Sequence, residues 1–274
     1  MKTSIELIHD TLILGIKAFF KKSGFHKAVL GLSGGIDSAV VLCLAAKALG
    51  ANNVRSLLMP SRYSSESSVT DSIELSKRVG TQYDIIDIEK SFCAIEEGLA
   101  PLFTDKENDV TEENIQARLR AVFLMAVANK FGCILLNTSN KSETAVGYTT
   151  LYGDMAGGLS VIGDVYKTDV YKLAAYINRR NEIIPETIIQ KLPSAELKPN
   201  QLDSDTLPDY DILDNILYQY IELQTPVEEI TADRETVLRV IKLIKSSEYK
   251  RYQAPPIIRV SSKSADQMAL VAKW

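Results

Sequence analysis

Short apolar runs alternate with longer segments of helical pattern through the first 140 residues of the chain. The apolar runs predict four strands, at residues 27–33, 53–60, 82–88 and 133–139. The segments between them predict helices at residues 37–50, 65–80, 89–103 and 111–132, where Thr111 is the expected N-cap. Nearly continuous apolar strands that alternate with helices are typical of a buried parallel sheet. The pattern therefore predicts an α/β fold, a Rossmann-like open parallel β-sheet with helices on both faces.

The first 25 residues predict an amphipathic helix rather than a secretory leader. Glu6 and Asp10 interrupt the apolar positions, and no small-residue cleavage site follows them. No stretch approaches 18 apolar residues, so we expect no membrane as a partner. The apolar positions recur at helical spacing, at Ile5, Ile8, Leu12, Ile16 and Phe19.

The regular alternation ends after residue 140. Residues 141–167 are rich in glycine, threonine and tyrosine and show few helix or strand signals, which favours an ordered functional loop. Residues 167–181 predict another helix, residues 188–211 a surface lid or linker, and residues 209–247 two or three small helices. We expect a single domain over residues 1–274, with an α/β core at 1–181. The lid, a small helical C-terminal part and the tail then occupy residues 182–274.

Charge and cysteine content narrow the classes of function. The formal net charge is -4 and the pI about 5.4, whereas a nucleic-acid-binding protein usually presents a basic face. We therefore expect no nucleic-acid partner. Zinc sites and disulfides are not expected, because the sequence has no CxxC pair and only two histidines. Cys43, Cys93 and Cys133 are predicted to be reduced, inert thiols, which fits a cytoplasmic protein.

The segment AVLGLSGGIDSA, at residues 28–39, places a glycine turn between the first strand and the next helix. Gly34 and Gly35 allow a close backbone approach to a ligand, and the helix N-terminus attracts anions. No lysine follows the glycines, so this is not the common phosphate-binding loop. Asp37 repels phosphate unless a cation lies between them, and carboxylate with phosphate oxygens suits Mg²⁺. The alternative is an ordinary glycine turn at a helix start.

The loop SGGIDS resembles the SGGxDS loop of the PP-loop ATP pyrophosphatases, which have an adenine nucleotide α-hydrolase-like fold. Further segments occur in the order found in NAD⁺ synthetases, and the resemblance covers roughly residues 10 to 262. These segments are ENIQARLRA (113–121), NTSNKSETAVGYTTLYGDMAGG (137–158), DVYKTDVYKLA (164–174), PSAELKPNQLDSDTLPDYD (193–211) and YKRYQAPP (249–256).

The resemblance implies a ligase that amidates deamido-NAD⁺ to NAD⁺, with ATP as co-substrate and Mg²⁺ as cofactor. An adenylated intermediate would form as pyrophosphate leaves, and ammonia would then displace AMP. The similarity is greatest to the synthetase domain of the glutamine-dependent enzymes, whose amidohydrolase domain is absent from this sequence. We therefore expect free ammonia, or ammonia from a separate glutaminase subunit. The family also implies a homodimer formed around the helix at 111–131.

The matching motifs assign site residues, none of them a protein nucleophile. The resemblance places the following residues at ATP: Gly31, Leu32, Ser33, Gly34, Gly35, Ile36, Asp37, Ser38, Thr138, Lys167 and Ser194. It places another set at deamido-NAD⁺: Asn114, Arg118, Glu143, Tyr148, Tyr249 and Lys250. Asp37 and Glu143 would hold the metal ion. Lys167 would supply the positive charge that the opening loop lacks.

Each of these assignments has a structural alternative. Glu143 could be a helix-start acid favoured by the helix dipole, and Tyr148 could simply pack the loop. Asn114 and Arg118, four residues apart, share a helix face, and Arg118 could extend along its apolar stripe to solvent. That stripe is expected at Ile115, Leu119, Val122, Phe123 and Ala126.

Two departures from the family pattern and two other classes of function remain open. Some ammonia-dependent relatives carry a lysine at the position of Leu151 and an aspartate at that of Gly158, so those contacts do not transfer. A tRNA-modifying PP-loop enzyme would need a basic face. A non-catalytic partner subunit would not need to retain Asp37, Glu143 and Lys167. The tail after Lys263 matches nothing in the family.

Overall fold

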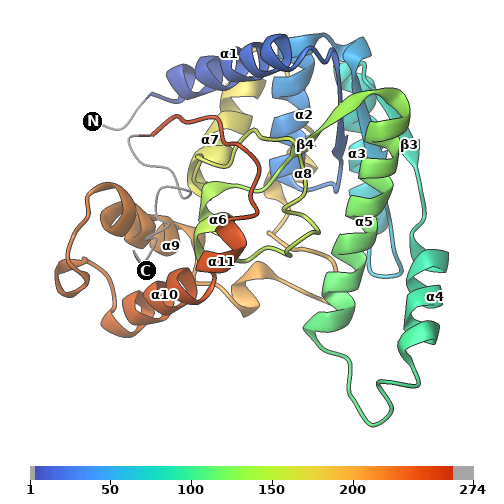
Figure 1. The fold of residues 1–274 in the computed structure, drawn as a ribbon. Coiled ribbons are helices and arrows are strands. Elements are labelled where there is room, and N and C mark those ends of the chain that lie inside the picture. The colour runs from blue at the N-terminus through green and yellow to red at the C-terminus, as the bar shows by residue number, and fades with distance from the viewer. Residues whose placement is uncertain (1–3, 262–274) are drawn as a thin grey trace.

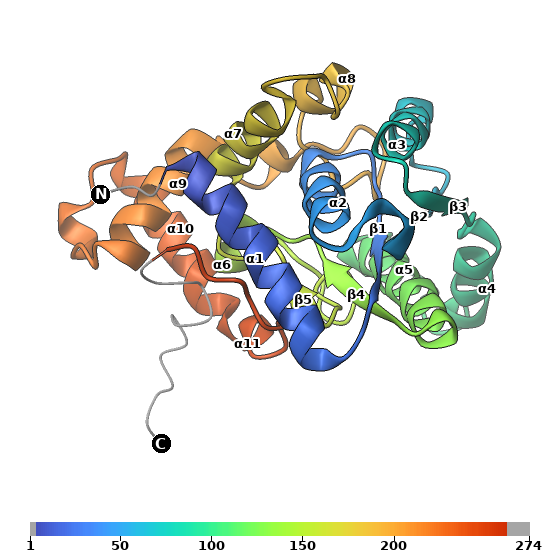
Figure 2. The same ribbon diagram turned by 90° about the horizontal axis from the view of Figure 1, so that it is seen from above.

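The structure is a computed structural model that describes residues 4–261. Five parallel strands form one sheet in the order β3-β2-β1-β4-β5, with all five labelled in the second view (Figures 1 and 2). The central strand places Val29 beside Arg55 on one neighbour and Leu135 on the other. This confirms the predicted parallel α/β sheet. The strands are β1 (Lys27–Gly31), β2 (Val54–Leu58), β3 (Gln82–Ile85), β4 (Cys133–Asn137) and β5 (Leu159–Ser160).

Helices cover both faces of the sheet, as predicted (Figures 1 and 2). On one face α1 (Ile5–Ser23), α2 (Ile36–Leu49) and α7 (Lys167–Asn178) pack together over the largest apolar cluster. On the other face α5 (Val110–Phe131) packs on β1 and β4, and α4 (Glu89–Leu99) packs beside it. The helix α3 (Glu66–Val79) contacts β2, β3 and the short α8 (Glu186–Gln190).

Local capping sets where the helices begin and end. The hydroxyl of Ser65 accepts a hydrogen bond from the Ser68 N–H at the start of α3. The helix α5 has its N-cap two residues earlier than expected, because Asp109 and Glu112 form a capping box. Asp109 accepts from the Thr111 N–H at 2.7 Å and Glu112 accepts from the Asp109 N–H at 2.8 Å. The prediction of Thr111 as the N-cap was therefore wrong.

The region after residue 140 holds more regular structure than the sequence indicated. Asn140 and Glu143 form a capping box that begins the six-residue helix α6 (Lys141–Val146), and β5 follows in the segment predicted as a loop. The expected small helices are present as α9 (Tyr210–Leu217), a π-helical turn (Tyr218–Glu222), α10 (Arg234–Ser246) and α11 (Glu248–Arg251). The helices α9 and α10 and the π-helical turn share an apolar cluster with α6.

The chain returns to the sheet at its C-terminal end. Ile257 forms a parallel bridge to Ser160 of β5, and the N–H groups of Val260 and Ser261 both donate to Asp164 at 2.8 Å. Short 3₁₀ turns at Ala51–Asn53, Asp203–Asp205 and Val227–Glu229 complete the elements. Within residues 4–261 no helix combines the length and apolar character that crossing a membrane would need.

The apolar stripe expected on α5 is only partly correct. Val122 is 64% exposed and Ala126 is also exposed, whereas Ala117, Ala121 and Ala128 are buried. Small residues face the sheet because α5 crosses close to β1 and β4. An apolar strip with Val122 and Met125 therefore remains on the outer surface.

Candidate active site

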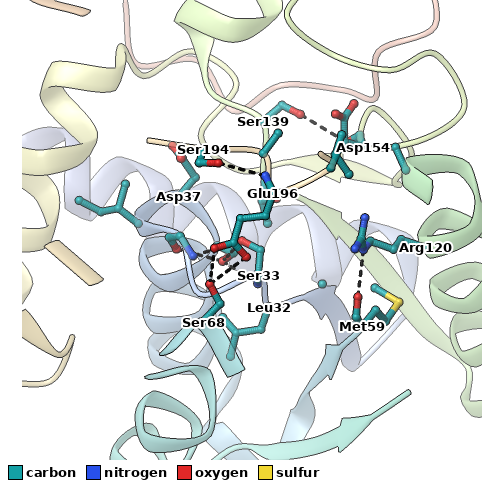
Figure 3. A pocket seen from close by; sticks show the side chains of 18 of the residues that line it. Leu32, Ser33, Asp37, Met59, Ser68, Arg120, Ser139, Asp154, Ser194 and Glu196 are labelled. Carbon is teal, nitrogen blue, oxygen red and sulfur yellow. Dashed lines mark hydrogen bonds between the residues drawn. The ribbon is translucent and has the colours of Figure 1, made fainter. Parts of the chain in front are cut away.

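A cavity of about 300 Å³ lies where β1, β2 and β4 end (Figure 3). Carboxyl ends of parallel strands are where open α/β sheets bind ligands. The phosphate loop, the start of the segment after β2, the middle of α5 and the segment at residues 191–203 line it. Of the residues predicted at ATP, these line the cavity: Gly31, Leu32, Ser33, Gly35, Ile36, Asp37, Ser38, Thr138, Lys167 and Ser194. Glu143 and Tyr148 line it as well.

The phosphate loop (residues 31–38) is held by its own hydroxyl groups. The Ser38 hydroxyl donates to the carbonyl of Gly35 at 3.1 Å and accepts from the Ser33 N–H at 3.2 Å. Gly35 is the N-cap of α2 and provides no side-chain cap, so the helix start can receive an anion from the cavity. Gly34 lies behind the cavity wall, with φ +79° and a Cβ position only 2.6 Å from backbone atoms of Ser68. The loop is therefore pressed against the first turn of α3.

One ammonium group joins the two predicted metal ligands. Lys167 Nζ contacts Asp37 and lies 3.3 Å from Glu143 Oε1, and its side chain is 4% exposed. Burial raises the pKa of Glu143 to about 8, with the neighbouring Asp37 adding to the rise and Lys167 opposing it. Burial lowers the pKa of Lys167, but Asp37 and Glu143 outweigh it and hold that pKa above its ordinary value. The positive charge that the loop lacks thus lies beside Asp37.

Asp37 and Glu143 supply the oxygen donors that Mg²⁺ prefers. Among the described residues, no group of three or more His, Cys, Asp or Glu side chains could hold a metal ion unaided. Mg²⁺ is commonly bound by one or two carboxylates together with substrate phosphate oxygens. Two carboxylates facing the phosphate loop fit that kind of site once a nucleotide supplies the remaining ligands.

Asn140 positions both carboxylates and was missed from the sequence. Its side-chain oxygen accepts from the Glu143 N–H at 2.9 Å, and its amide nitrogen donates to Asp37 at 2.9 Å. Glu143 is therefore a helix-start acid, as the structural alternative proposed, and a cavity residue at the same time. The spacing Asn-x-x-Glu of the capping box was the signal that could have identified Asn140.

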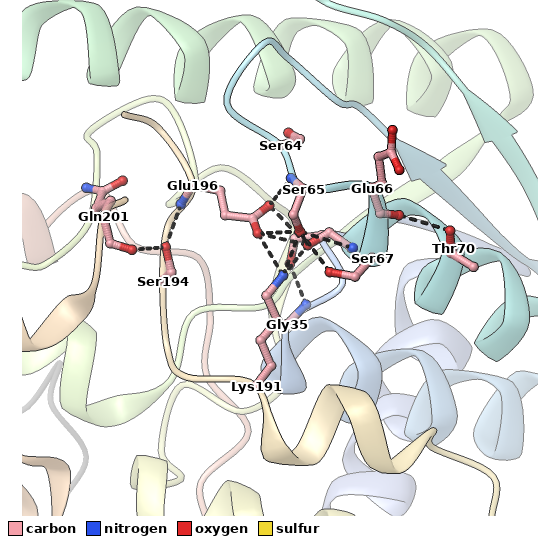
Figure 4. Close-up of polar contacts among 12 residues, drawn as sticks. Gly35, Ser64, Ser65, Glu66, Ser67, Thr70, Lys191, Ser194, Glu196 and Gln201 are labelled. Atoms are coloured by element: carbon pink, nitrogen blue, oxygen red, sulfur yellow. Dashed lines mark hydrogen bonds and ion pairs between the residues drawn. The ribbon is translucent and has the colours of Figure 1, made fainter. Parts of the chain in front are cut away.

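The segment at residues 191–203, which we call the lid, is fixed to the start of α3 (Figure 4). Glu196 accepts from the Ser65 hydroxyl at 2.9 Å, from the Ser68 hydroxyl at 3.0 Å and from Lys191 Nζ at 2.7 Å. Burial raises the pKa of Glu196, but these donors outweigh it and lower the pKa overall. The Ser194 hydroxyl donates to the Gln201 carbonyl at 2.6 Å and accepts from the Glu196 N–H at 3.1 Å. Its expected phosphate contact stays a prediction.

Arg120 is a cavity residue that sequence reasoning did not name. Its Nε donates to the Met59 carbonyl at 3.0 Å (Figure 3), and burial lowers its pKa to about 10. Arg118, two positions earlier, is exposed and does not line the cavity. Residues two apart on a helix point to different sides, so only one of the two arginines can face inward. The other charged cavity residues missed were Asp154, Lys191, Glu196 and Asp203.

Of the remaining residues predicted at deamido-NAD⁺, three contact the turn at residues 147–151 beside the cavity: Asn114, Arg118 and Lys250. Asn114 accepts from the Thr150 hydroxyl at 2.6 Å and Arg118 donates to the Leu151 carbonyl at 3.2 Å, so they share one side of α5. Lys250 Nζ donates to the carbonyls of Gly147 and Thr149 at 2.8 and 2.7 Å. Tyr249 is 57% exposed. Tyr148, which belongs to this turn, is the one that reaches the cavity.

Residues 8–254 match the NAD synthase family. A glutamine-dependent NAD(+) synthetase of Synechocystis sp. is 49% identical over 262 residues, which are 94% of this chain and 47% of that protein. The chain therefore spans about half the length of the curated relatives it matches.

Three solved structures resemble the chain over most of its length. The glutamine-dependent NAD⁺ synthetase of Acinetobacter baumannii, in complex with ADP, has a TM-score of 0.67 and 41% identity, covering 95% of this chain and 48% of that one. The NMN synthetase of Francisella tularensis has a TM-score of 0.80 and 27% identity, covering 91% and 97%. The NH₃-dependent NAD synthetase of Campylobacter jejuni has a TM-score of 0.74 and 29% identity, covering 90% and 96%.

Proposed function

The chain belongs to the NAD synthase family, and we propose that it amidates deamido-NAD⁺ to NAD⁺ at the expense of ATP. The reaction forms a carbon–nitrogen bond and releases AMP and pyrophosphate. The observation that carries the proposal is the meeting of the loop SGGIDS with Lys167, Asp37 and Glu143 at one cavity. Such a site suits a reaction in which the protein neutralises charge on the phosphates of ATP and the substrate, not a protein side chain, is the nucleophile.

In the first step, the nicotinate carboxylate attacks the α-phosphorus of ATP and pyrophosphate leaves. The chain contributes by binding the phosphates in place and neutralising charge, which are the main tasks in phosphoryl-type transfer. Ser33 and Ser38 line the cavity beside the start of α2, whose N-cap has no side-chain hydrogen bond. Lys167 and Arg120 supply buried positive charge from two different walls.

Asp37 and Glu143 would hold Mg²⁺ together with oxygens of the nucleotide. When bound there, the metal ion supplies positive charge for the leaving pyrophosphate. Lys167 contacts both carboxylates directly, so we propose that its ammonium group turns toward the phosphates when nucleotide and metal ion are present.

In the second step, ammonia attacks the acyl carbon of the adenylate and AMP leaves. The lid supports this step, because a covered site protects a reactive acyl-adenylate from water. Ammonia is the nitrogen donor in the proposal, free or delivered by a glutaminase subunit. The Campylobacter jejuni structure named NH₃-dependent, which the chain matches over 96% of that protein, supports ammonia as the donor at this domain.

We place the deamido-NAD⁺ site at Tyr148 and around the turn at residues 147–151. The contacts of Asn114, Arg118 and Lys250 with that turn support the placement. The exposed apolar strip of α5, with Val122 and Met125, supports a homodimer formed through this helix.

The division into core and lid, and a cytoplasmic location, remain predictions.

A purified-protein assay tests the proposal. The chain is mixed with ATP, Mg²⁺ and ammonium chloride, and either deamido-NAD⁺ or nicotinate mononucleotide, and NAD⁺ or NMN, AMP and pyrophosphate are measured. We expect NAD⁺ and AMP in equal amounts with the dinucleotide. If only the mononucleotide is turned over, the activity of the chain is instead NMN synthesis, for which the Francisella tularensis structure is named. Isothermal binding of deamido-NAD⁺ gives a second readout, and no binding with or without ATP–Mg²⁺ would exclude the proposal.

A further inference from the structure

The helix α9 contacts the ammonium group of Lys167 and also the first turn of α7, where Lys167 lies. The ring of Tyr210 lies 5.2 Å from Lys167 Nζ, and Asp214, one turn later on α9, reaches the backbone where Lys167 begins its helix. Residues four apart share one face of a helix, so a single face of α9 makes both contacts. Tyr210 is itself fixed, since its hydroxyl donates to Asp203 at 2.8 Å.

Asp214 supplies the N-terminal cap that α7 lacks. The N-cap residue of α7, Tyr166, makes no side-chain cap, although the first N–H groups of a helix need acceptors. The Thr168 N–H donates to Asp214 at 2.9 Å. The Lys167 N–H donates to the Ser142 hydroxyl at 2.9 Å, and that hydroxyl donates to the other oxygen of Asp214.

This cap is buried and comes from a distant part of the chain. Asp214 is 6% exposed and Ser142 is fully buried, so water cannot replace either contact. A carboxylate at a helix N-terminus is also stabilised by the helix dipole. Lys167 is the first residue of α7, so any fraying of that first turn moves its ammonium group.

We propose that Asp214 is a positioning residue for the adenylation step, because it fixes the start of α7 and thereby the ammonium group of Lys167 beside Asp37 and Glu143. The inference rests on the proposed function, since it assigns Lys167 to the phosphates. Asp214 does not line the cavity, so it acts through Lys167 rather than on the substrate. A misplacement of about 1 Å at a reacting group can cost a hundredfold in rate.

The test uses Asp214→Asn in the full chain, with Asp233→Asn as the matched control. Asparagine keeps the shape of the side chain but has only one accepting oxygen. Either the Ser142 hydroxyl or the Thr168 N–H therefore faces the amide nitrogen and loses its acceptor. Asp233 caps α10 with the same chemistry, accepting from the Thr236 N–H at 2.9 Å and the Thr236 hydroxyl at 2.8 Å. We expect kcat for pyrophosphate release to fall at least about tenfold in Asp214→Asn, with KM for deamido-NAD⁺ within about twofold of wild type. Asp233→Asn keeps both constants.

A double-mutant cycle separates positioning from general loss of structure. In a Lys167→Ala background, Asp214→Asn should lower the residual rate no further, since its effect passes through the missing ammonium group. A purely structural role would instead multiply the two losses and overturn the inference, as would a wild-type kcat in Asp214→Asn.

A measurement of hydrogen exchange tests the capping step separately from the rate. Hydrogen exchange of the peptide at residues 165–172 should be faster in Asp214→Asn and unchanged in Asp233→Asn; unchanged exchange in Asp214→Asn would refute the capping step. If the wild type releases no pyrophosphate, the proposed function fails and this inference fails with it. If only the variant result differs from expectation, the proposed function stands.

Discussion

Lys167 and Asp37 form a buried ion pair at the phosphate loop although 130 positions separate them in the chain. The pair joins the first turn of α2 to the first turn of α7, and Glu143 from α6 completes it. Three helix starts thus converge on one point, and their side chains replace the lysine that the loop does not contain.

Asp37 is expected to be required for adenylation. Asp37→Ala removes a proposed metal ligand and the nearest partner of Lys167, so pyrophosphate release should fall by about a hundredfold or more. The measurement is pyrophosphate release with deamido-NAD⁺ and ATP, with and without Mg²⁺. Omitting Mg²⁺ should abolish release by the wild type. Release at the wild-type rate from the variant would disprove the role of the aspartate.

Glu143 should make the stability of the protein depend on pH. Its pKa is raised to about 8 in the fold from an ordinary value near 4.5, so between those pH values the folded state holds a proton that the unfolded state has lost. The stabilisation is complete below about pH 4.5 and is lost as the pH rises toward 8. Glutamine does not titrate, so Glu143→Gln lacks this pH-dependent contribution to the free energy of unfolding. The wild type should therefore lose roughly 1–3 kcal/mol relative to the variant between pH 5 and 8.

Urea unfolding of both proteins at several pH values measures that difference. A constant difference in unfolding free energy across this range, or one that favours the wild type as the pH rises, would contradict the raised pKa.

Gly34 should not tolerate a side chain. Gly34→Ala adds a Cβ 2.6 Å from the backbone of Ser68 at a φ of +79°. Gly24→Ala is the matched control, with φ +75° and no atom within 4 Å of the new Cβ. We expect about 1–2 kcal/mol of destabilisation from the left-handed backbone in both, and a further loss with a weakened ATP affinity only in Gly34→Ala. Denaturant unfolding and ATP titration test this, and equal effects of the two changes would contradict the clash.

Glu196 should hold the lid against α3. Glu196→Ala removes four acceptor contacts, so ATP should bind several-fold more weakly and proteases should cut residues 191–203 faster. Lys198→Ala is the control, because its ion pair with Glu113 is half exposed and such pairs contribute little. Identical protease sensitivity of the Glu196 variant and the wild type would show that the latch does not hold the lid.

The sequence predicted the sheet and the phosphate loop because both depend on local patterns. Apolar runs such as residues 133–139 identify strands, and two glycines after a strand identify a turn. Lys167 was located only through a family motif, since a lone lysine at a helix start carries no signal of its own. Its partner Asp37 becomes apparent only when the fold closes.

The site residues that were not predicted depend on which way a helix side chain points, or on contacts between residues far apart in the sequence. Arg118 and Arg120 are chemically alike, and only the rotation of α5 against the sheet decides that Arg120 enters the cavity. Val122 was expected to be buried, but the contact of α5 with β1 and β4 selects alanines instead. Glu196 bonds to residues 128 and 131 positions away, which no local pattern contains.

Because the cap on α7 comes from α9, the site can be completed only after α9 has been synthesised. Asn140 lies 103 positions after Asp37, and Lys167 lies 130 positions after it. Asp214, the acceptor for the Thr168 N–H, lies 46 positions after Thr168. Contacts of such long separation form late, and domains are made from the N-terminus onward. A nascent chain released only as far as β4 carries the glycine loop without its cation. The ability to bind a nucleotide therefore arises only once α9 has left the ribosome.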